Sequence, residues 1–93
     1  MPDISHDVTD TKGRYSVVID GAEAELTYSI ASPTLLIADH TYVPDALRGT
    51  GTGVLLAQRL VENARAQGAK IIPLCPFVKA QASKHPDWAD VIQ

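Results

Sequence analysis

The stretch Arg48-Gly49-Thr50-Gly51-Thr52-Gly53 joins two segments of different hydrophobic periodicity and decides the fold of the chain. Residues 34–43 before it are apolar and strand-like, whereas residues 53–67 after it have an amphipathic, helical pattern. Glycines at such a junction let backbone N–H groups approach a bound anion at the positive end of the helix dipole. The stretch therefore predicts a binding site for a phosphate-bearing cofactor.

Size and composition limit the classes of protein to consider. The chain has 93 residues, so we expect residues 1–93 to form a single domain. Its formal charge of −3 argues against a nucleic-acid-binding surface, which needs clustered Lys and Arg. No segment approaches the ~20 apolar residues of a membrane span, and the N-terminal residues lack the pattern of a signal peptide. A single cysteine, Cys75, cannot form an internal disulfide, so we expect a cytoplasmic protein.

The hydrophobic pattern predicts an α+β domain with the order β-β-β-α-β-α. Two apolar runs around Asp20-Gly21 indicate a β-hairpin, and the third run ends at Pro44, which cannot donate to a sheet ladder. The first half of that third run is continuously apolar, which is typical of a strand covered on both faces. The period then changes to about 3.6 residues, with Val54, Ala57, Val61 and Ala64 on one face, and Gly68 provides the expected helix cap.

The expected elements are, in order, a loose N-terminal arm or short edge strand at 1–13, strands at 14–20, 22–30 and 34–43, a helix at 53–67, a strand at 69–75 and a helix at 77–84. A strand, a helix and a strand in succession imply a parallel pair. The fold class is thus a two-layer α+β domain, an antiparallel meander followed by one parallel crossover.

Two common phosphate-binding motifs do not fit the glycine stretch. A nucleoside-triphosphate P-loop needs Gly-Lys-Ser/Thr, whereas Gly53 is followed by Val54 and Leu55. A dinucleotide-binding fold needs a longer doubly wound sheet, whereas the helix here follows an antiparallel meander. What remains is the pattern Arg-x-x-Gly-x-Gly, filled by Arg48, Gly51 and Gly53.

With this pattern the sequence resembles the GCN5-related N-acetyltransferases, in particular a minimal branch of chains of about this length. The matching segments are His40-Thr41-Tyr42-Val43-Pro44, residues 47–53, Pro73-Leu74-Cys75-Pro76-Phe77 and His85-Pro86. The resemblance implies acetyl-CoA as co-substrate and an amine of a small molecule or protein as acceptor. It also implies that the backbone near Tyr42 and Val43 pairs with the pantetheine arm. By the same resemblance the pyrophosphate is held by Arg48, Gly49, Thr50, Gly51, Thr52 and Gly53.

Cys75 and His40 are the candidate catalytic residues. Cys75 precedes a helix N-terminus, where the dipole favours a thiolate, and in the resembling branch this position lies close to the acetyl group. It is expected either to accept the acyl group or to form a pocket wall, and a buried core cysteine is the alternative. His40 is a candidate general base near neutral pH; its alternatives are a histidine bonded at the sheet edge or paired with Asp39.

One departure from the family pattern bears on catalysis. Many members place a tyrosine on the last helix to protonate the departing thiolate, but this chain has Gln81 in that helix and no tyrosine after Tyr42. Two functions follow: an acetyl-CoA-dependent N-acetyltransferase, or alternatively a non-catalytic acyl-CoA-binding or sensing module. The histidines, the cysteine and the acidic residues show no metal-ligand spacing, so no metal site is predicted.

Overall fold

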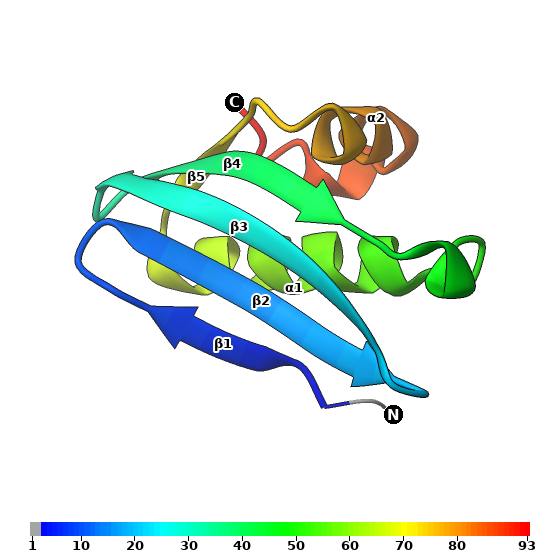
Figure 1. Ribbon diagram of the computed structural model, residues 1–93. Coiled ribbons are helices and arrows are strands. Elements are labelled where there is room, and N and C mark those ends of the chain that lie inside the picture. The colour runs from blue at the N-terminus through cyan, green and yellow to red at the C-terminus, as the bar shows by residue number, and fades with distance from the viewer. Residues whose placement is uncertain (1–2) are drawn as a thin grey trace.

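The computed structural model describes residues 3–93, which form a five-stranded sheet flanked by helices (Figure 1). The elements are β1 (Ser5–Val8), β2 (Lys12–Ile19), β3 (Ala22–Ser32), β4 (Leu35–Tyr42), a 3-10 turn η1 (Asp45–Leu47), α1 (Thr52–Gln67), β5 (Lys70–Pro73), α2 (Pro76–Lys84) and a second 3-10 turn η2 (Pro86–Trp88). The strand order in the sheet is β1-β2-β3-β4-β5; the first four strands are antiparallel and β4 pairs with β5 in parallel. The predicted fold class is confirmed.

The N-terminal residues form an edge strand where a loose arm was the first expectation. β1 pairs with β2 and places His6 opposite Tyr15. The two rings stack with centroids 4.0 Å apart, and Nε2 of His6 lies 2.8 Å from the hydroxyl of Tyr28. Lys12, expected in the arm, is the first residue of β2. Residues 1 and 2 of the expected arm lie outside the described residues.

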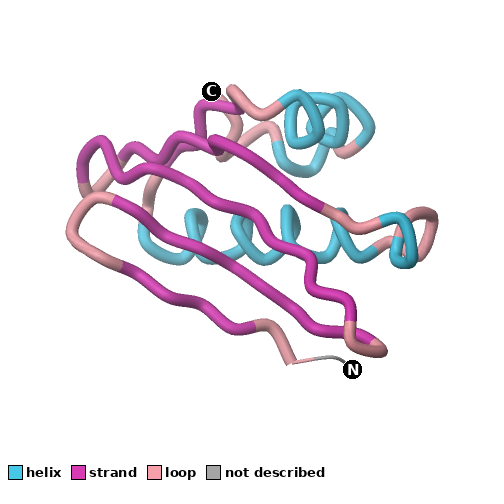
Figure 2. Tube along the Cα trace, in the orientation of Figure 1, coloured by secondary structure: helices cyan, strands magenta, loops and turns pink. Residues whose placement is uncertain are grey.

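Helix α1 covers one face of the sheet, as Figure 2 shows. Ala57, Val61 and Ala64 are buried as the pattern predicts, but Val54 is only half-buried. A fully buried leucine or valine contributes about 1.5–3 kcal/mol, so these contacts dominate the stability of the layer pair. Gly68 caps α1 in the left-handed conformation, as predicted. Among residues 3–93, no helix has the length and hydrophobicity needed to cross a membrane.

Strand β4 carries an irregularity where its pairing with β5 ends. Thr27 of β3 pairs with His40 while the next residue, Tyr28, pairs with Ala38, so Asp39 is an extra residue that forms a β-bulge. Pairing with β5 ends at Ala38, opposite Pro73. Beyond the bulge, β4 continues to Tyr42 without a β5 partner.

The apolar first half of β4 is covered less completely than expected. Leu36 and Ala38 are buried against the core, but Leu35 and Ile37, which point to the other face, are half-buried. The prediction of a strand covered on both faces is therefore wrong: α1 packs on the core face, where Leu36 and Ala38 lie, and the residues of the other face stay partly exposed.

The C-terminal tail protects the outer edge of β5. Ile71 donates its N–H to the carbonyl of Val91 at 2.7 Å, and Gln93 donates to the carbonyl of Ile71 at 2.8 Å. The tail is also held by Arg65, whose Nε and Nη2 atoms lie 2.8 and 2.7 Å from the carboxylate oxygens of Asp90. This edge is thereby closed to further strand pairing.

Candidate functional site

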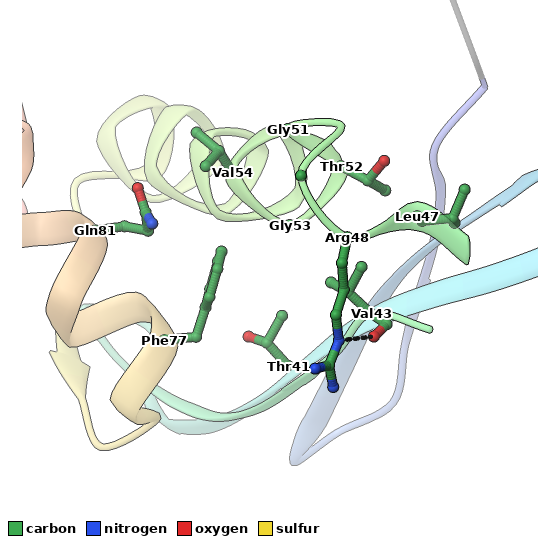
Figure 3. Close-up of a pocket in the computed structure, with 11 residues that line it drawn as sticks. Thr41, Val43, Leu47, Arg48, Gly51, Thr52, Gly53, Val54, Phe77 and Gln81 are labelled. Atoms are coloured by element: carbon green, nitrogen blue, oxygen red, sulfur yellow. Dashed lines mark hydrogen bonds between the residues drawn. The ribbon is translucent and has the colours of Figure 1, made fainter. Parts of the chain in front are cut away.

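A cleft of about 460 Å³ opens between the glycine stretch, the end of β4 and helix α2 (Figure 3). Its lining residues are Thr41, Val43, Leu47, Arg48, Gly49, Gly51, Thr52, Gly53, Val54, Phe77 and Gln81. Most residues predicted for the cofactor loop are therefore brought together on one wall of this cleft. The opposite wall comes from α2, which the sequence analysis did not assign to cofactor binding.

The glycine loop needs its glycines for backbone conformation. Gly49 and Gly51 have φ angles of +78° and +82°, in the left-handed region where other residues are strained. Gly51 is also the N-cap of α1, and no side chain caps this helix end. The first helical bond runs from the N–H of Leu55 to the carbonyl of Gly51 at 3.0 Å, so the preceding N–H groups of the first turn lack intrahelical partners. These donors, at the positive end of the α1 dipole, suit an anion in the cleft.

Gly53 is needed for a different reason, namely close packing. A Cβ atom at this position would lie 2.7 Å from Cζ of Phe77 and 3.2 Å from Cγ2 of Val43. The start of α1 thus touches α2 and the residue after β4 at one point. Gly53 defines how closely the two walls of the cleft approach.

The hydroxyl groups of the loop threonines stabilise the loop from within. Thr50 Oγ1 donates to the carbonyl of Leu47 at 2.5 Å and lies 2.7 Å from Thr52 Oγ1. Because a hydroxyl has one proton, Thr52 must donate to Thr50. Both hydroxyl protons, and the N–H of Thr50, which donates to Leu47 at 3.3 Å, are then used inside the loop, so the free donors are the backbone N–H groups at the start of α1.

Arg48 lies at the rim of the cleft. Its Nε is 3.2 Å from Oδ1 of Asp45 and 3.5 Å from the carbonyl oxygen of Val43. The side chain is 70% exposed, so this ion pair is weak and the guanidinium is free to turn toward an anion. Of the two residues predicted to pair with the pantetheine arm, Val43 lines the cleft, whereas the side chain of Tyr42 is half exposed and is not among the lining residues.

Cys75 is a buried residue just behind the wall of the cleft. It is the N-cap of α2 and its side chain is 3% exposed. Its N–H donates to the carbonyl of Ala38 at 2.9 Å, and its Sγ lies 3.3 Å from Oγ1 of Thr41. Thr41 lines the cleft and Cys75 does not. Thr41 therefore links the thiol to the lining of the cleft.

His40 lies on the other face of β4. It pairs with Thr27 of β3 and is exposed, and because neighbouring strand residues alternate, its side chain points away from the face that carries Thr41. The expected pairing with Asp39 is not seen; the Asp39 carboxylate instead accepts from Ser29 at 2.6 Å and from Lys12 at 3.4 Å. The structure does not bring His40 and Cys75 together.

Five residues that line the cleft are not among the predicted site residues: Thr41, Leu47, Val54, Phe77 and Gln81. Phe77 and Gln81 are four residues apart and so share one face of α2, a spacing that is visible in the sequence. The orientation of Thr41 depends on the bulge at Asp39, which has no clear signature in the sequence. Within residues 3–93 there is no cluster of His, Cys, Asp and Glu side chains that would hold a metal ion.

A glycine loop at a strand-to-helix junction, next to the parallel pairing of β4 with β5, defines an α+β domain with a cleft at the start of its long helix. Residues 14–91 match the family model described as GCN5-related N-acetyl-transferase. A solution NMR structure of a GCN5-like protein from Staphylococcus aureus is similar over 100% of this chain and 91% of that chain, with 33% identity and a TM-score of 0.75. No curated protein sequence matched. The chain belongs to the GCN5-related N-acetyltransferase family and is thus an enzyme of the N-acetyltransferase class.

Proposed function

We propose that the chain transfers an acetyl group from acetyl-CoA to a primary amine of a small molecule or protein. The observation that supports this is the shape of the cleft. Unpaired N–H groups and Arg48 lie at one end, suited to a pyrophosphate, and an apolar wall of Val43, Val54 and Phe77 lies beside them, suited to a pantetheine arm. The thioester would lie beside the end of β4 beyond the bulge, which has no β5 partner.

In the direct reaction the amine nitrogen attacks the thioester carbon, the C–N bond forms and the C–S bond breaks. The proton of the amine is lost and coenzyme A leaves as a thiol or thiolate. Backbone N–H groups at this end of β4 would stabilise the oxyanion, and loss of one such donor typically costs about 3–4 kcal/mol in the barrier.

The lining of the cleft does not supply a side chain that could accept the proton of the amine. None of the described residues that line it carries an imidazole or a carboxylate. For His40 to act as the base, the amine would have to approach from the exposed face of β4, opposite the cleft. A water molecule on the acceptor side is the other base consistent with this geometry.

A second route passes the acetyl group through Cys75. Its sulfur would attack the thioester carbon, release coenzyme A and form an acyl-enzyme, which the amine would then cleave to regenerate the thiol. This route predicts ping-pong kinetics and a covalent adduct on the protein. Intact mass spectrometry after mixing with acetyl-CoA tests it, and a Cys75→Ser protein that acquires the same adduct would exclude Cys75 as the carrier.

Binding is tested first by calorimetry with coenzyme A and acetyl-CoA. We expect the wild-type chain to bind and Arg48→Ala to bind more weakly. The difference in affinity between the two proteins should be larger at low salt than at high salt, because salt screens an ionic contact. Arg59→Ala is the matched control: Arg59 is on α1, lies 4.0 Å from Glu62 and does not line the cleft. No heat and no thermal shift with ligand near 1 mM, a concentration that detects even a free energy of about −4 kcal/mol, would refute the proposal.

Transfer is tested separately with a panel of amines and mass detection of acetylated products. Transfer to at least one amine supports the enzyme. Tight binding with transfer to none of the amines, and no hydrolysis of acetyl-CoA, would instead favour the acyl-CoA-binding or sensing module.

A further inference from the structure

Thr41 both lines the cleft and contacts the only cysteine of the chain. It projects from the core face of β4, in register with the fully buried Leu26 of β3. Figure 3 shows it on the strand side of the cleft, between Phe77 and Val43. Its hydroxyl lies 3.3 Å from the sulfur of Cys75, a buried residue that does not itself line the cleft.

The sulfur has little room to move by itself. Cys75 is part of the buried core, and its backbone is bonded at both ends: its N–H to Ala38 at 2.9 Å, and its carbonyl to the N–H of Lys79 at 3.0 Å. The backbone bonds fix the position of the Cys75 Cα atom, and the surrounding core confines the sulfur. Thr41, by contrast, is half-buried and has the cleft on one side.

We propose that Thr41 is a positioning residue that screens Cys75: its hydroxyl bonds to the sulfur, its Cβ branch closes the wall, and a ligand in the cleft meets the thiol only after the Thr41 side chain turns. A β-branched side chain is stiff at χ1, so the closed arrangement is well defined and the open one is rare. The proposal rests on the proposed function in one respect, that an acyl-CoA is the ligand that fills the cleft. It follows that the resting enzyme favours direct transfer, and that acylation of Cys75 is limited by the motion of Thr41.

Three variants separate the shape of Thr41 from its hydroxyl. Thr41→Val keeps the branch and removes the hydroxyl, Thr41→Ser keeps the hydroxyl and removes the branch, and Thr41→Ala removes both. The readout is the rate at which iodoacetamide alkylates the protein, followed by intact mass. Because the chain has one cysteine, every adduct reports on Cys75.

We expect Thr41→Ala to be alkylated faster than the wild type by on the order of tenfold, which corresponds to ~1.4 kcal/mol. Thr41→Val should be alkylated at close to the wild-type rate. The alkylation rate of Thr41→Ser should lie between the rates of Thr41→Val and Thr41→Ala. Val61→Ala is the control for general loosening, because it removes a buried side chain of α1 that does not line the cleft; it should not accelerate alkylation.

Two outcomes would overturn the screening role: a Thr41→Ala protein that reacts at the wild-type rate, or a Val61→Ala protein that reacts as fast as Thr41→Ala. Saturating desulfo-coenzyme A, an analogue without the thiol that would itself consume iodoacetamide, provides an independent arm. It should slow alkylation of Thr41→Ala by occupying the cleft. Faster alkylation of Thr41→Ala that this analogue does not slow would support the screen and would count against the proposed acyl-CoA function, so failures of the two ideas are distinguishable.

Discussion

Gly53 and Phe77 meet so closely that a Cβ atom on Gly53 would stand 2.7 Å from Cζ of the Phe77 ring. This contact joins the first turn of α1 to the first turn of α2, the two helices that bound the cleft. Phe77 also lines the cleft, so any displacement of its ring changes the ligand-binding space. The last glycine of the loop therefore links helix packing to the width of the candidate cofactor site.

Gly53→Ala is expected to destabilise the protein, although alanine is the better helix former by about 0.8–1.0 kcal/mol. Overpacking of this kind typically costs about 1–3 kcal/mol, which exceeds the gain in helix propensity. The displaced Phe77 ring should also weaken coenzyme A binding. Urea unfolding and calorimetry measure the two effects. A second change, Phe77→Leu, should restore part of the lost stability; a Gly53→Ala protein more stable than the wild type would contradict the packing argument.

Gly49→Ala is expected to cost stability for a backbone reason. The φ angle of +78° is strained for alanine by about 1–2 kcal/mol, although nothing lies within 4 Å of the added Cβ atom. Gly21→Ala is a matched control, because Gly21 has a φ angle of +79°, equal open space and a place in the β2–β3 turn outside the cleft. Both variants should lose similar stability in urea unfolding, but only Gly49→Ala should weaken coenzyme A binding. Equal affinities of the two variants would argue against the loop as the pyrophosphate site.

The order of the elements could be predicted because each boundary has a local cause. Pro44 ends a strand, Gly68 caps a helix and Pro76 starts one, and the structure confirms each of these. The edge strand β1 was harder to predict because its residues are all exposed. It is held by the contacts of His6 with Tyr15 and Tyr28, which are distant in sequence.

The loop half of the site could be predicted, whereas the catalytic half depends on tertiary geometry. Glycine spacing and the change of period are local signals, so residues 48–53 were readable from the sequence. Which face of β4 a side chain occupies depends on the bulge at Asp39, because one extra residue exchanges the two faces. That is why Thr41 was overlooked, and why the separation of His40 from Cys75 was not foreseen.

The stability of the protein should fall as the solution becomes acidic, through His6. Burial lowers the pKa of His6 below its usual 6.5, with Arg59 acting in the same direction and Asp7 opposing it. Nε2 of His6 lies 2.8 Å from the hydroxyl of Tyr28, and the His6 ring stacks on Tyr15, so a charge on the ring would be added in a partly desolvated contact. A lowered pKa means that this contribution is fully present above pH ~6.5 and is lost as the pH falls through the folded-state value.

Urea unfolding of the wild type and of His6→Phe, at pH 7.5 and at pH 5.0, tests this expectation. Phenylalanine keeps a ring on Tyr15 but does not titrate, so the variant should lose less stability between the two pH values than the wild type does. The other two histidines, His40 and His85, are common to both proteins and cancel in the comparison. An identical loss in both proteins would show that His6 does not carry the pH dependence.

His40→Gln separates the two candidate bases for direct transfer. If His40 takes the proton of the amine, the variant should lose kcat/KM for the amine by on the order of 10²-fold near neutral pH, the usual range for a general base. Coenzyme A affinity should not change, because His40 faces away from the cleft. An unchanged kcat/KM would assign proton removal to water, and a fall in coenzyme A affinity would instead indicate a structural effect on β4.

Gln81→Tyr is expected to accelerate the reaction if departure of the coenzyme A thiolate limits the rate. Gln81 lines the cleft from α2, at the helix where many members of the family carry an acidic tyrosine, and an amide cannot donate a proton as an acid. A phenol at this position should raise kcat by on the order of tenfold. This is less than the roughly 10²–10⁴-fold effect of an evolved general acid, because the surroundings of the new tyrosine are not optimised. Gln81→Phe is the matched control, since it adds the same ring without the hydroxyl and should leave kcat no higher than in the wild type. Equal gains from both variants would show that the ring improves packing against the ligand, and that proton transfer to the thiolate is not the limiting step.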